Sequence, residues 1–280
     1  MVEPTNAVVQ PTDAALLAMA DRQSAEFFRS AADRPWARVW VDPDVIHGTT
    51  GIPLPVFNGA TNARFEAATA DERIEAVLEP FRRERIDMTW WVGPTSTPDD
   101  LVDRLVAHGL VVDECVPVMG RSLAGWVPGP PRPGLEIEIV VDRAGFHAAT
   151  DVMIAGFGMP AEIAPEIEAR YADFAIGPRA IQRVYLARQD GVAVATALGF
   201  VVDGVVGIYN VATRPEHRGR GAGSAVTAAA LDDAARHGAA AAILESSAMG
   251  RSLYERLGFR AIGSVTVLLG AFGAARPGEA

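Results

Sequence analysis

The sequence predicts an α/β protein built from two domains of similar size. β-branched runs alternate with helical patterns along the chain, a proline-rich segment interrupts it near the middle, and the two halves end in similar sequences. With 280 residues, of which 49% are hydrophobic, the chain is long enough for two hydrophobic cores.

The proline-rich segment spans residues 126–134 and reads WVPGPPRPG, with four prolines and two glycines. Proline removes a backbone donor and fixes φ, so neither a helix nor a strand is expected to continue through it. We therefore predict a first domain over residues 1–127, a linker over 128–134 and a second domain over 135–280.

The second half alternates between strand and helix patterns in a definite order. Asp-Gly pairs favour hairpin turns, a cap residue such as Asp142 favours a helix start, and Gly238 favours a helix end. The predicted strands are 135–141, 184–190, 192–202, 205–213, 240–247 and 260–269, and the predicted helices are 142–155, 165–174, 224–237 and 250–259.

A similar pattern occurs at the end of each half. Residues 89–120 and 242–270 both read as strand, short helix, glycine and strand, and Arg104 aligns with Arg256. Either the halves arose by duplication, or the likeness is that of any helix–glycine–strand unit. We favour duplication.

Charge and cysteine content narrow the classes of function. The net charge is −10 and every basic residue is arginine, so a general affinity for nucleic acid is not expected. Cys115 is the single cysteine, which excludes an intramolecular disulfide and suits a reducing compartment. No signal peptide or membrane-length apolar run is apparent. We expect a cytoplasmic, bacterial-type protein that does not bind membranes.

The segment ATRPEHRGRGAGSAV, residues 212–226, follows a β-branched run and precedes a helix pattern. A P-loop is excluded because it requires lysine. A dinucleotide fingerprint also fails, because the position of its third glycine holds Ser224 when counted from Gly219 and Val226 when counted from Gly221. The remaining pattern is R-x-x-G-x-G.

This pattern consists of Arg218, Gly221 and Gly223. Glycine tolerates positive φ, so the backbone can wrap a ligand closely, and its N–H groups can converge beside the positive end of the next helix. A diphosphate suits such a loop, and Arg218 and Arg220 add positive charge. The alternative is a plain connection with solvated arginines.

The chain resembles the GNAT-type acyl-CoA N-acyltransferases over about residues 135–270. RGRGAG at 218–223 matches the family's Q/R-x-x-G-x-G/A signature, and LESSAMGRSLYERLGF at 244–259 matches its second signature, with Tyr254 at the tyrosine position. The first half resembles a degenerate copy, with Val102 in place of that tyrosine and no glycine motif. The resemblance implies two GNAT-like domains in tandem, each with a mixed, mostly antiparallel sheet flanked by helices.

The resemblance also implies where acetyl-CoA binds. The pantetheine arm would extend the edge of strand 205–213, the diphosphate would lie over the glycine loop, and the next strand–helix turn would meet the cofactor. Ser247 and Arg251, which lie at this strand–helix turn, could instead be an ordinary cap and a surface residue. The implied cofactor-binding residues are Val211, Ala212, Thr213, Arg218, Gly219, Arg220, Gly221, Ala222, Gly223, Ser224, Ser247 and Arg251.

Two residues are candidates for proton transfer. By resemblance, Tyr254 would protonate the departing thiolate, although a core aromatic is the alternative. Glu245, on the strand before it, would accept the proton of the amine, or else it pairs with an arginine on the other face. His47, His108 and His147 show no metal-ligand spacing, and His217 and His237 flank the helix 224–237, where we expect them to be solvated, so we expect no metal.

The resulting hypothesis is an N-acyltransferase that moves an acetyl group from acetyl-CoA to an amine of a small molecule or peptide, by direct attack in a ternary complex. The alternative is a non-catalytic acyl-CoA-binding sensor or assembly module. We expect no nucleic acid partner and either a monomer or a homodimer.

Overall fold

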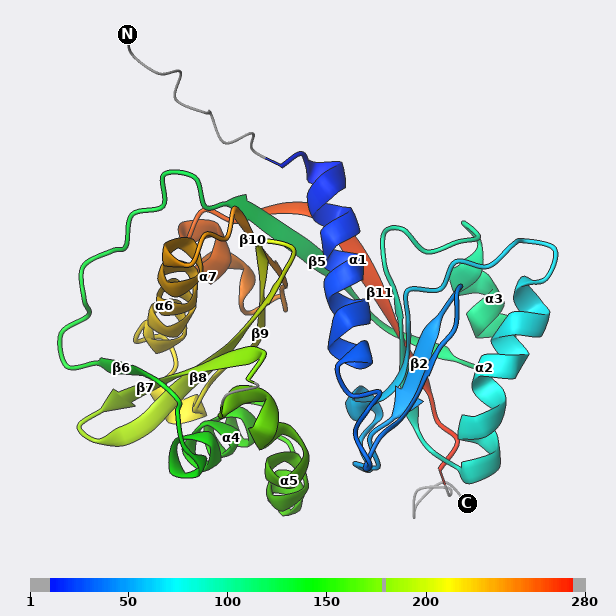
Figure 1. Ribbon diagram of the computed structural model, residues 1–280, viewed down its shortest axis with the longest axis horizontal. Coiled ribbons are helices and arrows are strands. Elements are labelled where there is room, and N and C mark those ends of the chain that lie inside the picture. Colours follow the sequence, from blue (N-terminus) through cyan, green and yellow to red (C-terminus); the bar gives the residue numbers. More distant parts are fainter. Residues whose placement is uncertain (1–10, 178–179, 274–280) are drawn as a thin grey trace, which may run out of the picture. The chain divides into compact units, whose positions relative to one another are not determined.

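The computed structural model describes residues 11–177 and 180–273, which form two compact units (Figure 1). Unit 1 comprises Met1–Leu16 and Met119–Ile262, and unit 2 comprises Leu17–Val118 and Gly263–Ala280. Helix α1 (Asp13–Arg29) and strands β5 (Val111–Ser122) and β11 (Arg260–Gly270) contribute residues to both.

These units divide the chain at different residues from the boundary predicted at 128–134. That proline-rich segment lies within unit 1, and the last strand passes into unit 2. The reason is strand pairing: Thr266–Gly270 of β11 run antiparallel to Met88–Val92, the whole of β4. The C-terminal strand therefore completes the sheet of the first half, an arrangement that a local composition signal cannot reveal.

Unit 1 contains a mixed, mostly antiparallel sheet in the order β5-β10-β9-β8-β7-β6. The pairs β6–β7, β7–β8 and β8–β9 are antiparallel, whereas β9–β10 is parallel. The strands are β6 (Glu136–Ile139), β7 (Gln182–Gln189), β8 (Val192–Val202), β9 (Val205–Thr213) and β10 (Ala241–Glu245). Each predicted strand of this half is confirmed to within a few residues.

The helices of unit 1 flank this sheet, with α6 and α7 on one side and α4 and α5 on the other (Figure 1). They are α4 (Arg143–Phe157), α5 (Ala164–Ala175), α6 (Ala222–Arg236) and α7 (Arg251–Arg256), with short 3-10 turns at Ala161–Ile163 and Pro215–His217. Asp142 caps α4 as predicted, accepting a hydrogen bond from the Gly145 amide at 2.8 Å.

The core of unit 1 lies between α6 and the sheet. Val226, Ala230 and Leu231 of α6 are fully buried there. At the far end of α6, the Asp233 carboxylate accepts hydrogen bonds from the Tyr185 hydroxyl at 2.7 Å and from the Arg183 guanidinium. Apolar burial and this anchored carboxylate fix the helix against the sheet, and so fix the position of its N-terminus.

Unit 2 has the sheet order β1-β2-β3-β4-β11-β5. Its first three strands are antiparallel and β3–β4 is parallel, so the unit repeats the strand–helix order of unit 1. Trp90 is fully buried in its core. The elements are β1 (Arg38–Val41), β2 (Ile46–Thr49), the 3-10 turn Pro55–Phe57, β3 (Asn58–Thr61), α2 (Ala70–Glu84), β4 and α3 (Leu101–Ala107).

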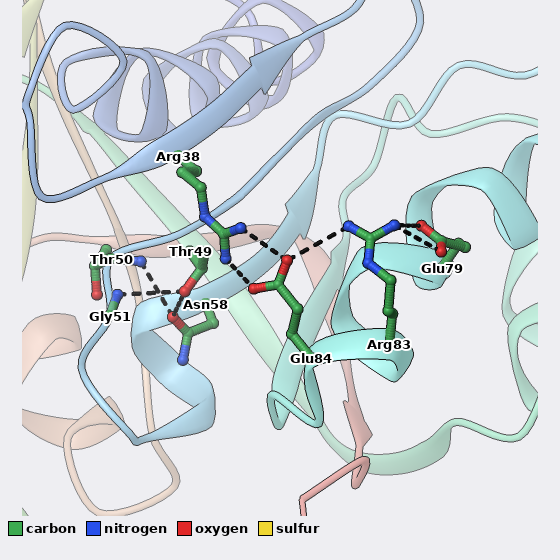
Figure 2. Close-up of polar contacts among 8 residues, drawn as sticks. All are labelled: Arg38, Thr49, Thr50, Gly51, Asn58, Glu79, Arg83 and Glu84. Atoms are coloured by element: carbon green, nitrogen blue, oxygen red, sulfur yellow. Dashed lines mark hydrogen bonds and ion pairs between the residues drawn. The ribbon is translucent and has the colours of Figure 1, made fainter.

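A buried amide, Asn58, fixes the loop between β2 and β3 (Figure 2). Its Oδ1 accepts hydrogen bonds from Thr49 Oγ1 at 2.7 Å and from the Thr50 amide at 3.1 Å, while Nδ2 donates to the carbonyls of Ile52 and Leu54 at 2.9 and 3.0 Å. Every polar atom of the side chain is thus used, which makes Asn58 the organising residue of this loop.

A chain of ion pairs that joins β1 to α2 lies beside it (Figure 2). Arg38 pairs with Glu84, Glu84 with Arg83, and Arg83 with Glu79 through two 2.8 Å hydrogen bonds. The Arg83 and Glu79 side chains are 61% and 57% exposed, so water screens the pair and its contribution to stability is small.

We expect the substitution Asn58→Ala to lower the free energy of unfolding of unit 2 by about 2–4 kcal/mol, because it leaves buried backbone groups without partners. Urea denaturation followed by tryptophan fluorescence measures this, since four of the five tryptophans lie in unit 2. The control Glu79→Ala should change the value by less than about 0.5 kcal/mol. Equal effects of the two substitutions would contradict this account.

Candidate functional site

The central feature of unit 1 is a parallel strand pair that separates along its length. Residues Val205–Gly207 of β9 lie opposite Ala241–Ile243 of β10. Among the described residues, no further pair continues this register, although β9 runs on to Thr213. The second half of β9 therefore pairs with β8 on one side, and on its other side it has no strand partner among the described residues, as the family resemblance implied.

A β-bulge shapes β9 within this unpaired half. Leu198 of β8 lies opposite Tyr209, whereas Thr196 lies opposite Ala212, so β9 holds one extra residue there. Asn210 has a φ of +51°, in the left-handed region that Asn tolerates better than most residues. A bulge interrupts the ladder locally, and among the described residues neither Asn210 nor Val211 has a partner in the register with β8. The sequence analysis missed this feature, for which an asparagine inside a β-branched strand was the available signal.

The glycine loop connects the end of β9 to the start of α6. Gly219 and Gly221 have φ values of +73° and +83°, which explains why glycine is required at both positions. Gly221 is the residue before the helix and supplies no side-chain cap. The first N–H groups of α6, from Ala222 onward, are therefore available to an anion at the positive end of the helix.

Arg218 anchors the loop. Its Nη2 donates to the carbonyl of Gly156 at 2.7 Å and its Nε donates to the carbonyl of Thr213 at 3.3 Å. The guanidinium thereby ties the glycine loop to the end of α4 and to the end of β9. The sequence analysis expected it to supply charge, whereas the structure also gives it this positioning role.

Small residues allow the helices to approach β9 closely. A Cβ on Gly156 of α4 would lie 2.8 Å from the Cβ of Ala212, and one on Gly223 of α6 would lie 3.1 Å from Thr213 Oγ1. Both distances are shorter than ordinary contacts, so larger residues would displace β9. This explains the second glycine of the R-x-x-G-x-G pattern by packing against Thr213.

Tyr254 lies on α7, where it is 7% exposed and packs edge-on against Phe259 at a ring-centroid distance of 6.0 Å. Burial raises the pKa of the Tyr254 hydroxyl to about 12, so it stays protonated at neutral pH. Among the described residues none hydrogen-bonds to this hydroxyl, whose oxygen is not fully enclosed. The side chain is thus both a core aromatic and a potential proton donor.

Glu245 and Tyr209 lie close together at the point where the two strands separate. The pKa of Tyr209 is raised, first by burial and then by the negative charge of Glu245. Glu245 ends β10 and is exposed. An exposed carboxylate beside a protonated phenol is an arrangement that can pass a proton to solvent.

Ser247 and Arg251 make local contacts at the start of α7. Ser247 Oγ accepts a hydrogen bond from the Gly250 amide at 3.2 Å, and Arg251 pairs with Glu255 at 2.9 Å. Their contact with a cofactor stays a prediction. The neighbouring Ser246, which the sequence analysis did not consider, is 1% exposed and donates to the Ser247 carbonyl at 2.9 Å.

The corresponding gap in unit 2 is closed by the chain itself. Beyond β3 and β4, Thr97 bonds with the segment that follows β3: its amide donates to the Ala63 carbonyl at 3.1 Å, and its carbonyl accepts from the Phe65 amide at 3.1 Å. The Asp21 carboxylate accepts a hydrogen bond from the Thr95 amide at 2.7 Å. The strand edge that is open in unit 1 is therefore occupied in unit 2.

Two kinds of feature are absent from the part of the chain that the structure describes. None of their helices has the length and apolar character required to cross a membrane. No group of three or more His, Cys, Asp or Glu side chains among them is arranged to hold a metal ion.

Comparison with solved structures agrees with the fold. A GCN5-related N-acetyltransferase from Kribbella flavida is 21% identical and has a TM-score of 0.72, with 90% of this chain and 95% of that chain covered. One from Sphaerobacter thermophilus is 16% identical, with a TM-score of 0.61 and coverage of 95% and 96%. A tandem GNAT protein from the clavulanic acid biosynthesis pathway is 12% identical, with a TM-score of 0.56 and coverage of 86% and 85%.

At these identities the likeness establishes the fold, and the tandem GNAT protein supports the two-unit layout. No curated protein sequence matches this chain. The family comparison is more specific, because residues 149–259 match the acetyltransferase (GNAT) family. This segment includes β9, the glycine loop, α6, β10 and Tyr254. Residues 149–259 therefore match a GNAT acetyltransferase domain, which indicates that the protein is an acyltransferase.

Proposed function

We propose that unit 1 transfers an acetyl group from acetyl-CoA to an amine of a small molecule or peptide, by direct attack within a ternary complex. The separation of β9 from β10 is the observation that carries this proposal. Beyond the separation, β9 has no strand partner on one edge among the described residues. The glycine loop that follows β9 ends at the N-terminus of α6, and the helix after β10 carries the protonated phenol of Tyr254.

The pantetheine arm would bind along the unpaired edge of β9, where backbone groups of Val211, Ala212 and Thr213 would hydrogen-bond its amides. The bulge at Asn210 supports this role, because it takes Val211 out of the regular register with β8. That amide would donate to the thioester carbonyl oxygen and stabilise the negative charge that develops during attack. The diphosphate would lie over Arg218–Ser224, against the free N–H groups of α6.

The reaction moves one proton from nitrogen to sulfur. The amine nitrogen attacks the thioester carbonyl carbon, the carbon–sulfur bond breaks, and the thiolate leaves. Tyr254 would donate its proton to that sulfur, since its raised pKa keeps it protonated until the thiolate forms.

Removal of the amine proton is the second part of this transfer. A free amine with a pKa of about 10 is mostly protonated at neutral pH, so a nearby acceptor lowers the barrier. We propose that Glu245 accepts this proton, directly or through a water near Tyr209. Its support is the exposed position at the end of β10 and its electrostatic effect on Tyr209.

The substitution Gly219→Asp should weaken acetyl-CoA binding by about 10-fold or more, because it places a negative charge at the predicted diphosphate position without a steric overlap. Isothermal titration calorimetry measures the dissociation constant. Gly238→Asp is the matched control: Gly238 also has a positive φ, at the other end of α6, and a Cβ there would meet no atom within 4 Å. Similar losses in the two variants would argue against a diphosphate site at the helix N-terminus.

The substitution Tyr254→Phe should lower kcat on the order of 100-fold while the dissociation constant for acetyl-CoA stays nearly unchanged, because the hydroxyl acts mainly in the transition state. Thiol release during acetyl transfer to an amine library measures the rate. An unchanged kcat would remove Tyr254 from the mechanism. Binding of acetyl-CoA by the wild-type protein without turnover on any amine would favour a non-catalytic acyl-CoA sensor.

The pKa of Tyr254 also predicts a pH dependence. Since this pKa is raised to about 12, the phenol remains the acidic form throughout the range in which amine acceptors lose their protons. The rate should therefore rise with pH up to the pKa of the acceptor amine and show no decline from about pH 8 to pH 10. A decline with an apparent pKa below about 10 that Tyr254→Phe abolishes would contradict this account.

A further inference from the structure

The proline-rich segment places a third arginine on the glycine loop. Nη1 of Arg132 donates to the carbonyl of Arg220 at 3.0 Å. Its guanidinium also lies against Gly221, so closely that a Cβ at that position would overlap it. Gly221 is thus constrained twice, by its positive φ and by the side chain of Arg132.

The charge of Arg132 is not compensated at this position. Within residues 11–177 and 180–273, neither Arg132 nor Arg218 nor Arg220 forms an ion pair with a carboxylate. All three lie at the N-terminus of α6, where the helix dipole is positive. A cation beside the positive end of a helix is unfavourable, and an anion that contacts both makes the arrangement favourable.

The segment holds Arg132 in place from both sides. Pro131 and Pro133 flank it and restrict the backbone. Trp126 and Leu135, at the two ends of the segment, pack against the core of unit 1, and the Arg121 guanidinium lies 4.5 Å from the centre of the Trp126 ring. An arginine delivered by an anchored, proline-rich segment loses little conformational freedom when it binds a ligand.

We propose that Arg132 is a diphosphate-binding residue of the coenzyme A site, contributed by the segment 128–134 rather than by the glycine loop. This inference rests on the proposed function. The guanidinium would donate two hydrogen bonds to oxygens of the diphosphate, whose other oxygens face the N–H groups of α6. The role of the segment is then to carry a cation to the cofactor.

The test compares the wild-type protein with Arg132→Ala by calorimetric titration with coenzyme A, dephospho-coenzyme A and pantetheine. We expect the variant to bind both nucleotide forms about 10-fold or more weakly, because it loses charge-assisted hydrogen bonds. Binding of pantetheine, which lacks the diphosphate, should be unchanged. Arg132→Lys should recover part of the loss, and Arg236→Ala, at the exposed opposite end of α6, should have no effect.

Other results would overturn the proposal. Equal binding by the wild type and Arg132→Ala removes Arg132 from the site while leaving the proposed function intact. A loss with coenzyme A but not with dephospho-coenzyme A would assign Arg132 to the 3′-phosphate instead of the diphosphate. Tighter binding by the variant would make Arg132 an obstruction. A folded wild-type protein that binds neither nucleotide form would overturn the proposed function together with this inference.

Discussion

The separation of two parallel strands is the constraint on which the site in unit 1 depends. Hydrogen bonding between β9 and β10 ends at Gly207 and Ile243, yet β9 continues to Thr213 because β8 still pairs with its other edge. An unpaired strand edge exposes backbone groups that require partners. The protein keeps this edge open in the interior of a sheet, where the helices on both sides hold β9 in position.

Several contacts maintain that position. Arg218 ties the glycine loop to α4 and to the end of β9, and Asp233 fixes the far end of α6 through Tyr185. Gly156 lets α4 approach β9 closely. These residues act through backbone placement: they determine where the amides of the bulge and of the helix N-terminus point, which is what pre-organised binding requires.

The two units show how the same order of elements gives an open or a closed strand pair. In unit 2 the strands also separate after a short parallel register, but Thr97 bonds to the chain on both sides of Arg64 and closes the gap. The Asp21 carboxylate accepts a hydrogen bond from the nearby Thr95 amide. Backbone groups that a ligand could use in unit 1 are thus paired within the protein in unit 2, which agrees with the absence of a glycine motif in the first half.

The local sequence determined most of the element bounds in unit 1 and the position of its glycine loop. Asp-Gly turns, the Asp142 cap and Gly238 set the element bounds, and the R-x-x-G-x-G pattern located the loop with its two positive-φ glycines. Only the tertiary structure decided the pairing of β11 with β4, the bulge at Asn210 and the placement of Arg132 on the loop. The reason is physical: turns and caps depend on neighbouring residues, whereas strand order and side-chain contacts between distant segments depend on which surfaces the folded chain brings together.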